Sequence, residues 1–124
     1  MMQANKRYDL EERTAILGEN IIDLVNNLSE NNTNFRLKDQ VLRSGTSVGA
    51  NYCEADCAES RKDFEHKLGI CKKECKETKH WLRMILKSEP KLGKEIKRLW
   101  GEAHELQLIF ITIIKKSKIN SNRS

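Results

Sequence analysis

Apolar positions recur along this chain at intervals of three and four residues, the spacing of one face of an α-helix. In the first segment, about residues 9–29, this stripe consists of Leu10, Thr14, Leu17, Ile21, Leu24 and Leu28. We expect three further helices at about residues 35–59, 61–87 and 91–116. Strict alternation of apolar and polar residues, which is typical of a half-buried strand, is absent.

Short polar breaks separate the four predicted helices. Residues 29–34 are rich in turn-forming side chains, and residues 60–63 resemble a helix-capping box. Helices of this length joined by short loops predict an all-α protein, an antiparallel up-down-up-down four-helix bundle. We expect one domain over residues 1–118, followed by a frayed polar tail at residues 119–124.

Composition is typical of a helical protein, with 33% charged residues and a single proline. There is no run of about 18 apolar residues, so we expect no membrane span. The stretch MMQANKRYDLEER lacks the apolar core of a secretory signal peptide. We therefore expect a cytoplasmic protein with its cysteines unpaired.

Positive charge is concentrated in residues 61–98, which carry 13 basic and 6 acidic residues. Five cations without an acidic residue among them share one face of the predicted helix 61–87: Lys72, Lys76, Lys79, Arg83 and Lys87. Like charges at this spacing repel each other, and a face that meets only water usually interleaves glutamates. The stripe indicates contacts with nucleic-acid phosphates; a solvated charged face is the alternative. No aromatic residue interleaves with it along the helix, so no platform for base stacking is predicted.

The segment LRSGTSVGANYCEA, residues 42–55, places two glycines inside a predicted helix, where each costs about 0.5–1 kcal/mol relative to alanine. A phosphate-binding loop is excluded, because no lysine follows the second glycine and no strand precedes the first. Small side chains recur there every four residues: Gly45, Gly49, Cys53 and Cys57. The middle of the apolar stripe on helix 61–87 is small as well: Cys71, Cys75 and Thr78. We expect these two helices to pack tightly there, and the glycines to allow close packing within a subunit or between subunits.

The four cysteines also form two C-x3-C pairs, at positions 53/57 and 71/75. A zinc site would need all four sulfurs to converge on one metal ion. In a reduced compartment a free cysteine behaves as a small apolar residue, and we favour that interpretation, with no metal and no cofactor. The spacing of the acidic residues and histidines identifies no catalytic pair, so we expect no enzymatic activity.

A third face of helix 61–87 mixes charges with a large aromatic residue: Lys67, Ile70, Glu74, Glu77, Trp81 and Met84. This mixture suits a subunit interface, in which a tryptophan anchors the contact and flanking charges set the register. Trp100 and Tyr52 are candidates to extend it. The alternative is an ordinary core tryptophan with exposed neighbours.

Two stretches, LRSGTSVGANYCEA and SRKDFEHKLGICKKECKETKHWL, resemble the bacterial four-helix-bundle proteins related to the large-subunit rRNA intervening-sequence proteins. The same superfamily includes the accessory variability proteins of diversity-generating retroelements. The resemblance is strongest over residues 41–83 and is closer to the intervening-sequence branch.

This resemblance implies an up-down four-helix bundle assembled as a ring-shaped homopentamer, with no catalytic role. Relatives of the retroelement type bind nucleic acid through a basic surface and associate with a reverse transcriptase. The matching positions, which the resemblance marks as structural or assembly residues, are Arg43, Ser44, Gly45, Ser47, Gly49, Asn51, Asp63, Phe64, Lys67, Lys73, Glu74, Glu77, Thr78 and Trp81.

Two functional hypotheses follow from the residues and the resemblance together. The first is a non-catalytic, homo-oligomeric, pentameric bundle that binds RNA or DNA through its basic helix surface. The alternative is a protein–protein scaffold or accessory subunit that recruits a partner such as a reverse transcriptase.

Overall fold

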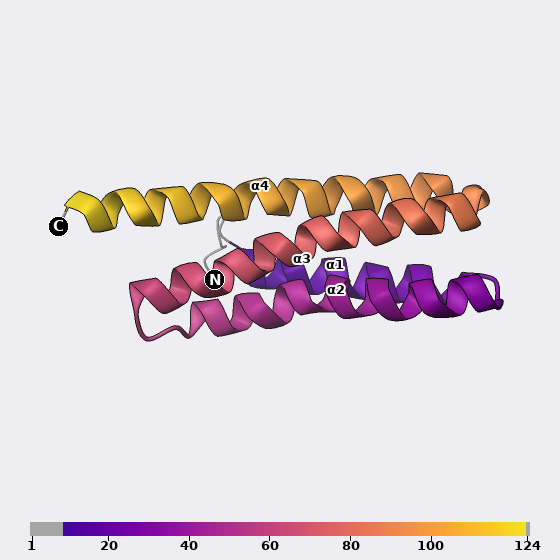
Figure 1. Cartoon of the computed structure of the whole chain (residues 1–124), viewed down its shortest axis with the longest axis horizontal. Helices are drawn as coiled ribbons and strands as arrows, with labels where there is room; N and C mark the ends of the chain where they lie inside the picture. Colours follow the sequence, from indigo (N-terminus) through magenta and orange to yellow (C-terminus); the bar gives the residue numbers. More distant parts are fainter. Residues whose placement is uncertain (1–8, 124) are drawn as a thin grey trace, which may run out of the picture.

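The computed structural model describes residues 9–123, and all regular structure in that range is helical. The elements are α1 (Leu10–Asn26), α2 (Asn32–Asp56), α3 (Arg61–Ser88), the 3-10 helix η2 (Pro90–Leu92) and α4 (Gly93–Arg123). Helix α2 packs between α1 and α3, α3 packs against α4, and α4 contacts α1 over a shorter length (Figure 1). The predicted all-α four-helix bundle is therefore confirmed.

Polar side chains begin three of the helices. Asp9, Asn31 and Ser60 each accept a hydrogen bond from the backbone N–H three residues later, at 3.4, 2.8 and 3.0 Å. Each cap satisfies one of the N–H groups that the first turn of a helix leaves without a partner. The predicted breaks at residues 29–34 and 60–63 therefore fall where the structure starts α2 and α3.

The core is built from the predicted apolar stripes. All six positions of the first predicted stripe, five on α1 and Leu28 just after it, are buried, as are Leu68, Leu82 and Ile85 on α3 and Phe110 on α4. Phe110 is the largest fully buried side chain, and the ring of Tyr52 lies 6.3 Å from it, centroid to centroid. Tyr52 thus packs towards α4 and does not extend the face that carries Trp81.

A buried polar network joins two loops at one end of the bundle. Glu89 accepts the backbone N–H of Ser29 at 2.6 Å and Nδ2 of Asn34 at 3.1 Å. Asn34 Nδ2 also donates to the carbonyl oxygen of Ser29 at 2.7 Å, and Ser88 Oγ donates to Asn34 Oδ1 at 2.6 Å. Hydrogen bonds from Ser29 lower the pKa of Glu89. The sequence indicated only a polar break at this point.

Helix α4 is longer than predicted. Residues 119–123, expected as part of a frayed tail, are helical, while Ser124 lies outside the described residues. The prediction took polarity as a sign of helix termination, but no glycine or proline follows Gly101 to end the helix. With 31 residues against the 17 of α1, α4 continues past the first turn of α1 (Figure 1). No helix in residues 9–123 has an apolar stretch long enough to cross a membrane.

Candidate nucleic-acid interface

Helix α3 has two different flanks beside its buried stripe. The α2-facing flank consists of Lys67, Ile70, Glu74, Glu77 and Trp81, the residues predicted as a subunit interface. Lys67 Nζ lies 2.6 Å from Oε1 of Glu54 on α2, and an arginine on α2, Arg43, pairs with both Glu74 and Glu77. The charges of this flank therefore have partners within the chain.

Trp81 and Glu74 are held in place by the same flank. Trp81 Nε1 donates to Glu77 Oε2 at 3.0 Å, and its ring packs against the core and makes a T-shaped contact with the ring of His80. Glu74 is only 6% exposed, with Arg43 at 3.4 Å. Ile70 and Trp81 are both half-buried, and they are the apolar side chains of this flank that reach the surface.

The α4-facing flank carries the five cations of the predicted phosphate-binding stripe. Lys76, Arg83 and Lys87 are exposed, and Lys72 and Lys79 are half-buried. Within residues 9–123, none of the five forms an ion pair with a carboxylate. The stripe is thus uncompensated positive charge, in contrast to the α2-facing flank.

An aromatic cluster lies beside this stripe. The ring of Trp100 on α4 stacks on His104, with ring centroids 5.1 Å apart and planes 19° apart. Lys79 Nζ lies 2.9 Å from His104 Nδ1 and 4.8 Å from the centre of the Trp100 ring. Trp100 therefore belongs to the α3–α4 surface, not to the α2-facing flank that it was expected to extend. No aromatic residue interleaves with the cations on α3 itself, as expected. Trp100 on the neighbouring helix α4 nevertheless lies beside them, which the pattern along α3 did not predict.

Further cations continue the basic surface onto the start of α4. A Cβ atom at Gly93 would lie 3.4 Å from Leu86 Cδ1, so the first turn of α4 is close to the last turns of α3. An open hollow of about 530 Å³ lies there, lined by Lys91, Leu92, Lys94, Glu95 and Arg98.

The two glycines of α2 face α1. A Cβ atom at Gly45 would lie 2.9 Å from Cγ1 of Ile21, and one at Gly49 would lie 3.3 Å from Oγ1 of Thr14. The glycines thus allow close packing, but against α1 and not against α3. Gly18 of α1 meets the backbone of α2 from the opposite side, a contact that the spacing of small residues on α2 did not predict.

Helices α2 and α3 approach each other through a neighbouring face of α2. Thr78 Oγ1 donates to Ser44 Oγ at 2.9 Å, and Cys71 Sγ lies 3.5 Å from the carbonyl oxygen of Val48. Cys71 and the next cysteine on the stripe, Cys75, are fully buried.

The cysteines lie in two different environments. Cys53 and Cys57 are exposed, so Cys53 does not belong to the close helix contact in which it was expected. Burial raises the pKa of both Cys71 and Cys75 to about 12, which keeps these thiols protonated. Within residues 9–123, no three His, Cys, Asp or Glu side chains come together in a way that could hold a metal ion.

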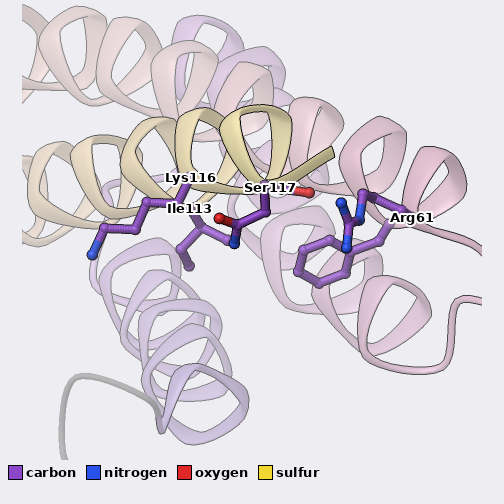
Figure 2. A pocket seen from close by; sticks show the side chains of 6 residues that line it. Arg61, Ile113, Lys116 and Ser117 are labelled. Atoms are coloured by element: carbon purple, nitrogen blue, oxygen red, sulfur yellow. The ribbon is translucent and has the colours of Figure 1, made fainter. Parts of the chain in front are cut away.

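A separate hollow of about 330 Å³ lies where α4 has passed the start of α1 (Figure 2). Phe64 and Ile113 line it together with Arg61, Lys116, Ser117 and Asn120. On the same flank of α4, nearer its start, Arg13 of α1 pairs with Glu102 at 3.1 Å. This hollow is therefore on the α1 side of α4, away from the Trp100 cluster.

Comparison with known proteins places the chain in a family. The model of the 23S rRNA-intervening sequence protein family matches residues 6–116. A solved structure from Bacteroides thetaiotaomicron VPI-5482, described as a protein of unknown function from the S23 ribosomal protein family, is 33% identical in sequence. The match covers 90% of this chain and 99% of that one, with a TM-score of 0.80. No curated protein matches. The chain belongs to the 23S rRNA-intervening sequence protein family.

Proposed function

We propose that this protein is a non-catalytic nucleic-acid-binding bundle that holds phosphates with the α4-facing flank of α3. The observation that carries the proposal is the contrast between the two flanks. The α2-facing flank pairs its charges within the chain, whereas the α4-facing flank leaves five cations without a carboxylate partner in residues 9–123. Like-charged neighbours on a helix are unfavourable, so a polyanion is the partner that best accounts for them.

The test is binding of labelled RNA and DNA as a function of salt concentration. Each phosphate contact contributes about 0.7–0.9 to the slope of log K against log salt. Replacing Lys76, Arg83 and Lys87 with alanine should therefore reduce that slope by about 2. Lys67→Ala removes a lysine from the paired flank and is the matched control, which should leave the slope unchanged. Binding that ignores salt, or a triple variant with the wild-type slope, contradicts the proposal.

The bundle is proposed to act as a homo-oligomer, a pentamer as the family resemblance implies. Ile70 and Trp81 are the apolar residues through which the α2-facing flank would meet a second copy. Trp81→Ala should then lower the mass measured by light scattering while helicity is retained. Trp100→Ala changes the other tryptophan, on the opposite flank, and should leave the mass unchanged. A Trp81→Ala oligomer as tight as wild type would place the interface elsewhere.

A second candidate function is recruitment of a protein partner, such as the reverse transcriptase that the resemblance suggests. It is favoured by the apolar side chains that α4 exposes, Leu108 at 50% and Ile119 at 53%. A partner retained on immobilised protein after nuclease treatment, and lost with Leu108→Ser, would support this function. We infer a cytoplasmic location for either function, because all four cysteines are free.

A further inference from the structure

The environment of Trp100 differs from that of an ordinary core tryptophan. Trp100 is 40% exposed and stands about two turns after the start of α4. Its neighbours are His104, which stacks on it, and Lys79, whose Nζ lies 4.8 Å from the ring centre. A lysine ammonium group within about 6 Å of an indole face is attracted to the ring electrons, so this contact also holds the ring in a defined orientation.

Both neighbours lie on the same side of the indole. Lys79 Nζ is within 2.9 Å of His104 Nδ1, so the two groups cannot lie on opposite faces of the ring. The other face of the indole is turned away from both of them. Beside Trp100, a Cβ atom at Gly101 would meet no atom within 4 Å outside its chain neighbours and helix backbone, and the Trp100 residue itself is 40% exposed, so this part of the α4 surface is open.

The exposed ring lies among cations. Lys76 and Arg83 are one turn before and one turn after Lys79 on α3, and Lys97 is one turn before Trp100 on α4. All three are exposed. Proteins that bind single strands combine these two elements, a positive surface that follows the phosphates and aromatic rings on which bases stack.

We propose that Trp100 is a stacking platform for an unpaired base, so that the protein binds single-stranded nucleic acid in preference to a duplex. The inference rests on the proposed phosphate-binding function and adds the class of nucleic acid to it. Lys76, Arg83 and Lys97 hold the phosphates on either side of the stacked base. Bases inside a duplex already stack on each other, so a duplex can use the cations but not the ring.

The experiment compares labelled oligouridylate, oligodeoxythymidylate and a duplex, each about 15 nucleotides long, by fluorescence anisotropy. Trp100→Leu should weaken binding of the single strand by about 5- to 150-fold and leave duplex binding within about twofold. Trp100→Phe keeps a flat ring and should restore most of the affinity. The double variant Lys76→Ala/Arg83→Ala should weaken single strands and duplex alike. Circular dichroism checks that each variant is folded.

The results separate this inference from the proposed function. If Trp100→Leu binds single strands as tightly as wild type while the double variant is weakened, stacking is overturned and phosphate binding stands. Equal weakening of single strands and duplex by Trp100→Leu, or no rescue by Trp100→Phe, also overturns stacking. If the wild-type protein binds none of the three nucleic acids, both proposals fail.

Discussion

Alanine at Gly45 is expected to destabilise the bundle, whereas alanine at Gly101 is expected to stabilise it. Both glycines are inside long helices, where alanine is favoured by about 0.8–1 kcal/mol. At Gly101 a Cβ atom meets nothing within 4 Å, so Gly101→Ala should gain about that amount.

At Gly45 the new methyl group meets a fixed neighbour. It would lie 2.9, 3.3 and 3.4 Å from Cγ1, Cγ2 and Cβ of Ile21, a side chain that is fully buried. Ile21 cannot move away without displacing other core residues, and overpacking of this kind costs about 1–3 kcal/mol. After the gain in helix propensity, the net loss for Gly45→Ala is about 1 kcal/mol. The two variants should therefore differ by about 2 kcal/mol in the free energy of unfolding.

Urea unfolding followed by circular dichroism measures this difference. All samples need the same protomer concentration, because dissociation of an oligomer changes the apparent stability. Gly69→Ala is a second control, since its Cβ atom would also meet nothing within 4 Å and should behave like Gly101→Ala. A Gly45→Ala protein that is as stable as Gly101→Ala would refute the close contact between α2 and α1.

Three other predictions concern cysteines, acid and a buried charge. Burial raises the pKa of Cys71 and Cys75 to about 12, so Ellman's reagent should react quickly with only the two exposed cysteines and with all four after unfolding in guanidinium. Hydrogen bonds from Ser29 lower the pKa of Glu89 below its usual 4.5. The charged Glu89 carboxylate therefore stabilises the fold above about pH 4.5, and this stabilisation is lost as the pH falls through the lowered pKa. The wild-type Tm should accordingly drop more steeply between about pH 5 and 3 than that of Glu89→Gln. Arg43→Ala should cost about 1–3 kcal/mol in urea unfolding, since it leaves a nearly buried carboxylate without its cation; a loss below about 0.5 kcal/mol would contradict this.

The fold could be predicted because helix periodicity is a local property of the sequence. Three- and four-residue spacing marks the buried side of a helix whatever it packs against, and the stripe from Leu10 to Leu28 is buried throughout. The end of α4 could not be found in this way. Apart from Ile119, the residues after Lys116 are polar, and polarity alone does not end a helix.

The partner of each helix face was harder to predict. On α2, Ser44 and Val48 face α3, while Gly45 and Gly49, one position later and thus about 100° further around the helix, face α1. Both faces carry small residues, so composition does not distinguish them.

At the candidate site, the neighbours of Trp100 could not be predicted from the sequence either. Trp100 is 21 residues from Lys79 in sequence, and only the antiparallel pairing of α3 with α4 brings the two side chains together. A pattern search along α3 alone finds the cations but not the ring. The sequence could have pointed to Trp100 only through the short connection between the two helices, residues 89–92, which forces neighbouring positions of the hairpin to meet.

The two flanks of α3 connect stability with the proposed function. On the α2-facing flank, opposite charges are paired, as with Lys67 and Glu54, and they add to the contact between the helices. On the α4-facing flank, like-charged neighbours each cost the helix about 0.2–0.5 kcal/mol, which the buried stripe between the flanks can offset. That repulsion is present whenever the chain is folded and disappears when a polyanion neutralises the stripe. Nucleic acid bound as proposed would therefore relieve a cost that the free bundle carries, and so couple binding to stability.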